Sequence, residues 1–231
     1  MKNILLFNEL AEAGKAKERA LELQKELSAY YRDLEPLSLK GLDLDAFLKT
    51  LTKDDNVILL GGDGTINHFV NQIGSNLIPC PLYLAEAGTG NDFALDVANY
   101  RDEKTKLIKI NDFINNLPYV EVKGKTYRFI NGIGYGIDGE CCVKAEQMKK
   151  EGATDIDYSK ITIDLLLHSY KGRTATVIVD GKEHKLSRVY IASAMNGRYY
   201  GGGMKVAPNQ ERGSGHLTFS VRSIKVNSEC C

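Results

Sequence analysis

The sequence predicts an α/β domain followed by a β-rich domain, and three observations support this fold class. Continuous apolar runs alternate with amphipathic helical patterns over about the first 100 residues, which is typical of βαβ units and a largely parallel sheet. From about Leu117 the pattern changes to short alternating segments, which favours antiparallel strands. The 231 residues are 43% hydrophobic, enough to bury a core. We therefore expect a parallel-sheet domain over residues 1–115 and an antiparallel β-sandwich domain over 116–231.

The elements of the first domain follow from apolar periodicity. Apolar side chains at helical spacing predict helices near residues 20–30 and 66–73, the latter with a stripe of Ile66, Phe69, Val70 and Ile73. Asp43 is placed to act as the N-cap of a further short helix. Strands are expected at residues 4–7, 37–39, 56–60 and 82–85.

The second domain is predicted from alternation with a period of two. Asp180-Gly181 is a strong two-residue hairpin signal between two such segments. Helices are expected near residues 140–150 and 161–168. Strands are expected at residues 119–122, 126–130, 174–179, 182–186, 189–194 and 217–221.

Charge and cysteine content exclude several classes of function. Thirty basic and thirty acidic residues cancel, so composition gives no argument for a nucleic-acid partner. The N-terminal apolar run is too short for a signal peptide, and no segment approaches the roughly 20 apolar residues of a membrane span. The five cysteines show no metal-binding spacing. We expect a soluble, cytoplasmic protein.

A glycine-rich turn follows the strand predicted at residues 56–60. Gly61, Gly62 and Gly64 allow the backbone to approach a ligand, and the N-terminus of the next helix offers unpaired N–H groups to an anion. Asp63, at the tip, is suited to binding Mg²⁺ or accepting a proton, and Thr65 is expected to cap the helix. The plain alternative is a tight turn in which Asp63 only caps a helix.

A second glycine-rich turn, Gly88-Thr89-Gly90-Asn91-Asp92, follows the next predicted strand. The carboxyl ends of neighbouring parallel strands lie at one edge of a sheet, where ligands bind. Two phosphate-binding turns at that edge are difficult to explain by packing alone. We therefore predict that both turns converge on one nucleotide triphosphate.

Four segments resemble the diacylglycerol kinase catalytic domain family, which includes bacterial lipid kinases and sphingosine kinases. They are GGDGTINHFVNQI, AGTGNDFA, FINGIGYGIDGECC and NGRYYGGGMKVAP. The resemblance covers nearly the whole chain. It implies a lipid kinase that uses ATP and Mg²⁺ to phosphorylate diacylglycerol or a related lipid in phospholipid metabolism. It also implies transient contact with the membrane surface. We further expect a cytoplasmic protein with no nucleic-acid partner, and a homodimer is an option.

The resemblance assigns roles to individual positions. Asn8, the loop to Gly14, the Gly61 to Asn67 segment and Thr89 are implied to line the ATP site, with Asp63 beside the γ-phosphate. Asn91 and Asp92 are implied to support the nucleotide pocket, and their alternative is an Asx turn.

Two further residues are implied to face the lipid head group. These are Asn131 and Asp138. For Asp138 an equally good alternative is the N-cap of the helix beginning near Glu140.

The chain departs from the family near its end. No Asp-Gly-Glu motif, whose Asp is the expected general base, follows Val221, which suggests truncation. Gly213-Ser214-Gly215 replaces an acidic run that helps to bind a structural Mg²⁺, leaving Glu211 as the acidic candidate there. Two alternatives therefore stay open: a catalytically inactive ATP- or lipid-binding remnant, and an NAD kinase, which shares GGDGT.

Overall fold

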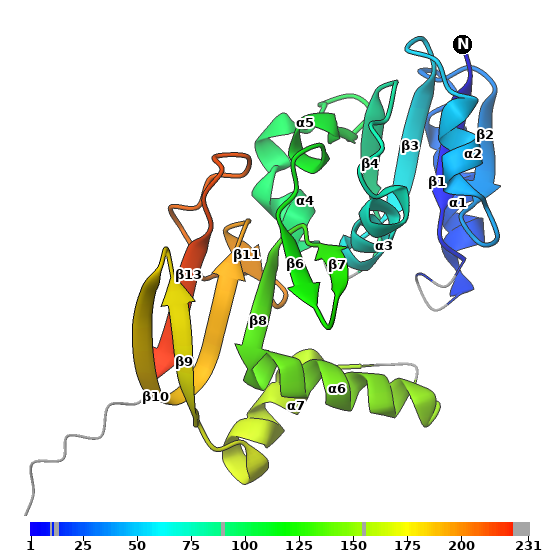
Figure 1. Cartoon of the computed structure of the whole chain (residues 1–231). Helices are drawn as coiled ribbons and strands as arrows, with labels where there is room; N and C mark the ends of the chain where they lie inside the picture. The colour runs from blue at the N-terminus through cyan, green and yellow to red at the C-terminus, as the bar shows by residue number, and fades with distance from the viewer. Residues whose placement is uncertain (10, 12–13, 89–90, 154–155, 224–231) are drawn as a thin grey trace, which may run out of the picture. The chain divides into compact units, whose positions relative to one another are not determined.

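The computed structural model describes residues 1–9, 11, 14–88, 91–153 and 156–223 (Figure 1). Spatial proximity divides the chain into two compact units. The first unit combines Met1–Asn131 with Asn196–His216, and the second combines Gly132–Met195 with the residues from Leu217 onward. Segment 196–216 is therefore packed with the N-terminal unit. The domain boundary expected near residue 115 stays a prediction.

The first unit is built on a five-stranded sheet in the order β2-β1-β3-β4-β5. The four strands β2, β1, β3 and β4 run parallel, and β5 is antiparallel to β4. This arrangement confirms the parallel-dominated sheet that the sequence predicts. The strand bounds are Asn3–Phe7 (β1), Leu34–Ser38 (β2), Asn56–Gly61 (β3), Leu82–Glu86 (β4) and Ile108–Lys109 (β5).

Helices cover both faces of this sheet. Asp43 accepts a hydrogen bond from Ala46 N at 3.0 Å, so the predicted N-cap of α2 is confirmed. The helices are α1 (Ala16–Glu26), α2 (Leu44–Lys49), α3 (Asp63–Ile73), α4 (Asp92–Asp96), the 3₁₀ turn η2 (Ala98–Tyr100) and α5 (Asn111–Ile114). An antiparallel hairpin, β6 (Tyr119–Val122) with β7 (Lys125–Arg128), belongs to the same unit.

Alternation along the buried strands divides the core of this unit into two layers. On β3, Val57 and Leu59 point into the cluster that contains the apolar stripe of α3, including Phe69. Ile58 and Leu60 point the other way, into the cluster that contains Ala20 and Leu23 of α1 and the other apolar residues of that face. Because each strand residue meets a helix on its own face, the strands are apolar throughout, as central parallel strands are.

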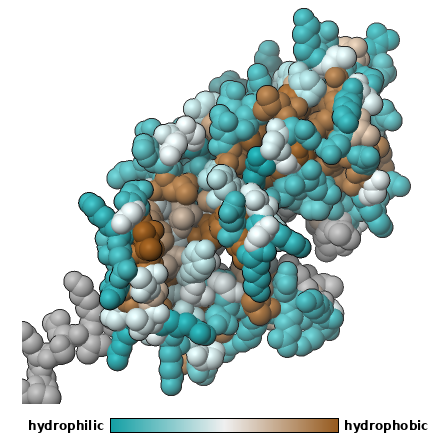
Figure 2. Space-filling model, viewed as in Figure 1, coloured by the Kyte–Doolittle hydropathy of each residue, from teal (hydrophilic) through white to brown (hydrophobic). Residues whose placement is uncertain are grey.

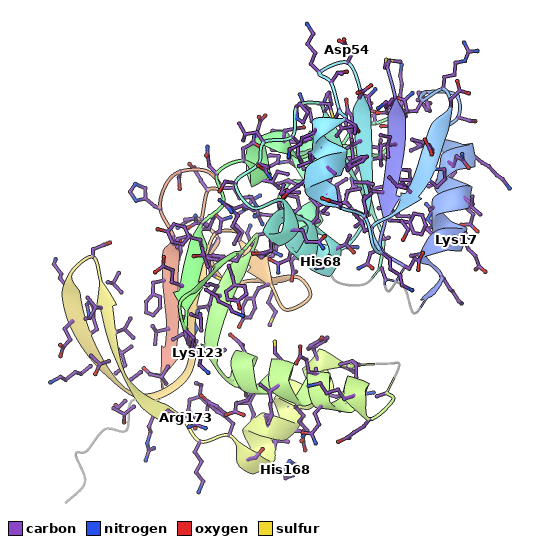
Figure 3. All side chains as sticks on the ribbon, turned by 45° about the vertical axis from the view of Figure 1, so that its right-hand side comes forward. Lys17, Asp54, His68, Lys123, His168 and Arg173 are labelled. Carbon is purple, nitrogen blue, oxygen red and sulfur yellow. The ribbon has the colours of Figure 1, made fainter. Side chains whose placement is uncertain are left out.

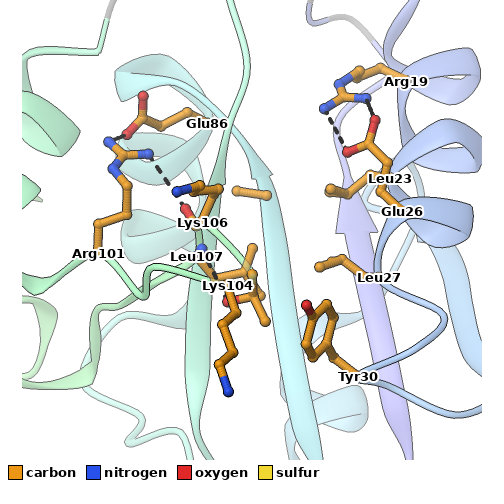
Figure 4. A pocket seen from close by; sticks show the side chains of 12 residues that line it. Arg19, Leu23, Glu26, Leu27, Tyr30, Glu86, Arg101, Lys104, Lys106 and Leu107 are labelled. Atoms are coloured by element: carbon orange, nitrogen blue, oxygen red, sulfur yellow. Dashed lines mark hydrogen bonds and ion pairs between the residues drawn. The ribbon is translucent and has the colours of Figure 1, made fainter.

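A polar trough of about 280 Å³ lies on the α1 face of the sheet (Figure 4). Leu23 of α1 and Leu27, the C-cap residue of that helix, line one wall, and the segment around Leu107 lines the other. Each wall carries an ion pair: Arg19 with Glu26 at 2.7 Å, and Arg101 with Glu86. These side chains are partly exposed, so the pairs contribute little to stability.

The second unit contains a sheet in the order β13-β10-β8, with β9 also pairing β10. All these pairs are antiparallel, which confirms the β-rich character predicted for this region. Apolar residues of α6, α7 and η3 form a separate cluster around Ile137, Ile161 and Leu165. The elements are β8 (Gly132–Gly136), α6 (Ile137–Lys150), α7 (Tyr158–Asp164), the π-helical turn η3 (Leu165–Ser169), β9 (Arg173–Val179), β10 (Lys182–Met195) and β13 (Thr218–Ser223).

The division of the chain around β10 differs from the prediction. Asp180 and Gly181 have φ values of 49° and 76°, so the predicted hairpin between β9 and β10 is confirmed. The segments expected as separate strands at 182–186 and 189–194 are both within β10. A register shift between Leu186 and Val189, with φ 50° at Arg188, interrupts the alternation that sequence reading relies on.

The visible surface of the molecule is mainly hydrophilic (Figure 2). In the space-filling view, hydrophilic residues cover much of the visible face, with smaller hydrophobic patches between them (Figure 2). Charged side chains such as Lys17 and Arg173 project outward in Figure 3. Across the part of the chain that the structure describes, no helix is long and apolar enough to cross a membrane.

Candidate phosphate-binding site

The two glycine-rich turns lie at the same edge of the first unit's sheet. In the strand register Phe7 pairs with Leu60, and Gly61 pairs with Glu86, so β1, β3 and β4 end side by side. Ala87 N donates to Gly61 O at 3.2 Å just beyond the paired strands. The predicted proximity of the two turns is therefore confirmed for their described residues.

The Asp63 carboxylate joins the two turns directly. Oδ2 accepts a hydrogen bond from Asp92 N and Oδ1 accepts one from Phe93 N, each at 2.9 Å. These N–H groups belong to the first turn of α4, which has no side-chain cap from Asn91. Asp63 therefore satisfies two of the first N–H groups of α4, the helix that follows the neighbouring strand. It does not cap its own helix α3, which was the plain alternative from the sequence.

Helix α3 begins without a side-chain cap. Its N-cap residue is Gly62, so the expectation that Thr65 caps this helix is wrong. Thr65 is instead buried inside the helix, and a Cβ added to Gly61 would lie 2.5 Å from Thr65 Oγ1. A Cβ added to Gly64 would meet nothing within 4 Å. Gly61 is thus needed for packing, whereas Gly64 leaves open space at the helix N-terminus, where anions bind.

Asp92 and Asn91 occupy different environments. Asp92 is buried, and its carboxylate accepts from Gly202 N at 3.0 Å and Gly203 N at 2.6 Å. Asn91 donates from Nδ2 to Gly88 O at 3.0 Å. Among the described residues, Asn91 Oδ1 is buried and has no hydrogen-bond partner. An unpaired buried oxygen beside the second turn is suited to a donor on a ligand.

The charge state of Asp63 reflects opposing influences. Burial raises the pKa of Asp63, and hydrogen bonds from Phe93 N, Asp92 N and the Asn131 side chain oppose that shift because they favour the carboxylate. The negative charge of Asp92 adds to the increase. A carboxylate whose pKa is raised in this way is a better proton acceptor than an exposed one.

A buried ion network lies behind this site, and sequence analysis did not identify it. Asp96, at the end of α4, accepts from Arg198 Nε and from Arg212 Nε, both at 2.5 Å. The side chains of Asp96 and Arg212 are only 3% and 5% exposed. One signal in the sequence could have indicated the network: Asp96 follows Phe93 and Ala94 and precedes Val97, so it is an acidic residue in an apolar run that requires a buried partner.

The other predicted nucleotide-site residues that the structure describes lie around the same edge. Asn8 immediately follows β1, and Gly14 has φ 89° in the loop beyond it. Asn67 is exposed on α3. Gly88 has φ 83° and is exposed. Thr89 lies outside the described residues.

The predicted lipid-facing residues belong to different units. Asn131 is in the first unit, where its Oδ1 accepts from Arg212 Nη2 at 2.7 Å. Asp138 is in the second unit, within the first turn of α6, which begins at Ile137. The alternative reading of Asp138 as the N-cap of a helix beginning near Glu140 is therefore wrong. Its Oδ2 accepts from the buried Ser193 hydroxyl at 3.2 Å.

The donor set suits a metal ion held mainly by phosphate. Among the described residues, no group of three or more His, Cys, Asp or Glu side chains could hold a metal ion. Glu211 is exposed and belongs to no such group. Because Mg²⁺ commonly uses one or two carboxylates together with substrate phosphates and water, Asp63 fits it in that manner.

Family comparisons give a consistent result. The family model described as "Diacylglycerol kinase catalytic domain" matches residues 2–119. A second model, described as "YegS C-terminal NAD kinase beta sandwich-like domain", matches residues 131–226. The second match agrees with the antiparallel sheet observed in that region.

Similar individual proteins carry related names. A "Putative lipid kinase" of Staphylococcus carnosus (strain TM300) is 25% identical over 87% of this chain and 67% of its own length. "Putative lipid kinase YtlR" of Bacillus subtilis (strain 168) is 24% identical over 66% of this chain and 53% of its own length. This chain thus spans between about half and two thirds of these relatives.

A solved structure shares the fold. It is titled "A putative diacylglycerol kinase from Bacillus anthracis str. Sterne", and it aligns with a TM-score of 0.60 and 22% identity. The alignment covers 95% of this chain and 75% of that one. At this level of identity the similarity establishes the fold alone.

Proposed function

Because this chain belongs to the diacylglycerol kinase catalytic domain family, we propose that it transfers the γ-phosphate of ATP to the hydroxyl of diacylglycerol or a related lipid. The observation that carries the proposal is the carboxylate of Asp63, which bonds the second glycine-rich turn while lying at the start of α3. One acidic side chain thereby lies where both turns meet. Phosphoryl transfer depends on this kind of positioning more than on covalent chemistry.

The residues of the two turns have distinct proposed roles. The uncapped N-terminus of α3 and the open space at Gly64 bind phosphate oxygens. Asp63 accepts the proton of the lipid hydroxyl or holds Mg²⁺, which when bound neutralises charge on the phosphates. The buried Asn91 Oδ1 accepts a hydrogen bond from the nucleotide.

Exchanging Asp63 for Asn tests the proposal. Asn keeps the size of the side chain and an acceptor for one of the α4 N–H groups, but it removes the charge and the base. We expect Asp63→Asn to reduce the transfer of radiolabelled phosphate from ATP to diacylglycerol in mixed micelles by about 100-fold or more. Asp54→Asn, at an exposed position of the same unit, serves as the control.

The same assay separates the alternatives. Transfer to NAD and not to lipid would show an NAD kinase, and ATP binding without transfer to either acceptor would show a nucleotide-binding protein that is catalytically inactive. Unchanged lipid phosphorylation by Asp63→Asn would remove Asp63 from the mechanism.

A further inference from the structure

Arg212 is a buried cation that the two glycine-rich motifs do not include. Its side chain is 5% exposed, and burial lowers the pKa of its guanidinium, although the charge of Asp96 opposes that shift. Removing a guanidinium from water is costly unless its donors are satisfied. Such a residue is therefore expected to have a specific set of partners.

Every nitrogen of this guanidinium has a partner in the first unit. Nε donates to Asp96 Oδ2 at 2.5 Å, Nη1 donates to Ile130 O, and Nη2 donates to Asn131 Oδ1 at 2.7 Å. The plane also lies over the ring of Phe93, with Cζ 4.7 Å from the ring centroid. A Cβ on Gly197 would overlap Nη2, so the backbone also packs closely against this group.

Two of these partners also contact Asp63. Phe93 donates its backbone N–H to Asp63 Oδ1 at 2.9 Å while its ring contacts Arg212. The Asn131 side chain, which accepts from Arg212, also lowers the pKa of Asp63 and so faces that carboxylate. Arg212 thus reaches Asp63 through two independent neighbours and forms no hydrogen bond with it in the structure.

The chemistry of the guanidinium fixes which way the Asn131 amide points. Arginine has donors and no acceptor, so it must face the carbonyl oxygen of an amide. With Oδ1 of Asn131 turned toward Arg212, the amide NH₂ is the group left on the side of the Asp63 carboxylate, where it favours the charged form. A lysine cannot reproduce the planar fork that contacts Asp96, Ile130 and Asn131 together.

We propose that Arg212 is a positioning residue that fixes the Asn131 amide and the Phe93 peptide around Asp63, and so sets the geometry of that carboxylate. Asp96 anchors Arg212. Arg198 also helps to neutralise the Asp96 carboxylate, because it donates to the other carboxylate oxygen and to the backbone carbonyl of Asp96. The kinetic part of this inference rests on the proposed kinase function. The structural part does not.

The structural part is tested by hydrogen exchange on the full chain with Arg212→Lys, which keeps the charge and lowers the risk of unfolding. We expect the Asp92 and Phe93 amides to exchange at least about 10-fold faster, while amides of the central strand β3 keep their protection. Arg32→Ala is the control, because that side chain is 92% exposed. Unchanged exchange at Asp92 and Phe93, or equal acceleration throughout the unit, would overturn the inference.

The kinetic part uses the same variant and a rescue. A misplaced carboxylate impairs the chemical step more than nucleotide binding, so we expect kcat to fall by about 10- to 100-fold in Arg212→Lys with the KM for ATP within about 2-fold. Arg212→Ala should recover part of its kcat when guanidinium is added at non-denaturing concentration, and Arg32→Ala should not respond. An unchanged kcat in Arg212→Lys, or no recovery in a folded Arg212→Ala, counts against the inference. If the wild type transfers no phosphate, the proposed function fails and the exchange result alone decides on Arg212.

Discussion

Gly61 and Gly64 lie in the same turn and have opposite surroundings. An alanine at position 61 would place Cβ 2.5 Å from Thr65 Oγ1, and the buried Thr65 has little room to move. An alanine at position 64 would contact nothing and would replace glycine in the first turn of α3. The first glycine is therefore needed by the fold, and the second is available to a ligand.

This difference gives a paired prediction at the residue scale. We expect Gly61→Ala to lower the free energy of unfolding by about 1–3 kcal/mol through overpacking. Gly64→Ala should raise it by about 0.5 kcal/mol, because alanine favours helix more than glycine does. Urea unfolding of both variants measures the effect.

The same pair separates folding from binding. If phosphate oxygens approach the backbone at Gly64, the stable Gly64→Ala variant should bind ATP more weakly, which calorimetric titration will detect. Wild-type affinity in this variant would place the phosphates elsewhere.

At the scale of elements, α2 offers the simplest test of a local sequence signal. Asp43 accepts from Ala46 N at 3.0 Å and thereby satisfies one of the first N–H groups of this six-residue helix. Asp43→Ala is expected to lower the free energy of unfolding by about 1 kcal/mol. Asp43→Ser keeps an acceptor and should stay close to the wild type in thermal unfolding. Equal losses in both variants would mean that the cap bond is not the cause.

Local periodicity was sufficient for most of the elements. The stripe of Ile66, Phe69, Val70 and Ile73 is buried along α3, because a helix on a sheet must bury one face. The dipeptide Asp180-Gly181 forms the predicted hairpin because both residues adopt positive φ. These features depend on neighbours within a few residues, which a single sequence displays.

The candidate site was predictable only in part. The proximity of the two glycine-rich turns follows from strand order, which alternating strands and helices indicate. That Asp63 caps α4 is a contact between residues 29 apart, and the pairing of Asp96 with Arg198 and Arg212 joins residues more than 100 apart. No local pattern encodes such pairings.

At the scale of the whole molecule, Asp55 connects the beginning of the chain to the turn before β3. Its Oδ1 accepts from Lys2 N at 2.5 Å, and its Oδ2 accepts from Thr52 N at 2.8 Å and from the Thr52 hydroxyl at 3.0 Å. The carboxylate is buried, and these hydrogen bonds hold the pKa of Asp55 below its usual value.

The sign of the resulting pH dependence is fixed by the direction of that shift. A carboxyl whose pKa is lower in the folded protein stabilises it at pH values above the pKa of the unfolded chain, and this stabilisation is lost as pH falls through the folded pKa. We therefore expect Asp55→Asn to lower the melting temperature at about pH 7, and the difference from wild type to shrink as the acid limit is approached. Asp54→Asn is the matched control, since its side chain lies on the exposed loop next in sequence (Figure 3). A difference between Asp55→Asn and wild type that stays constant with pH would show that the ionised carboxylate is not what holds Lys2 and Thr52 together.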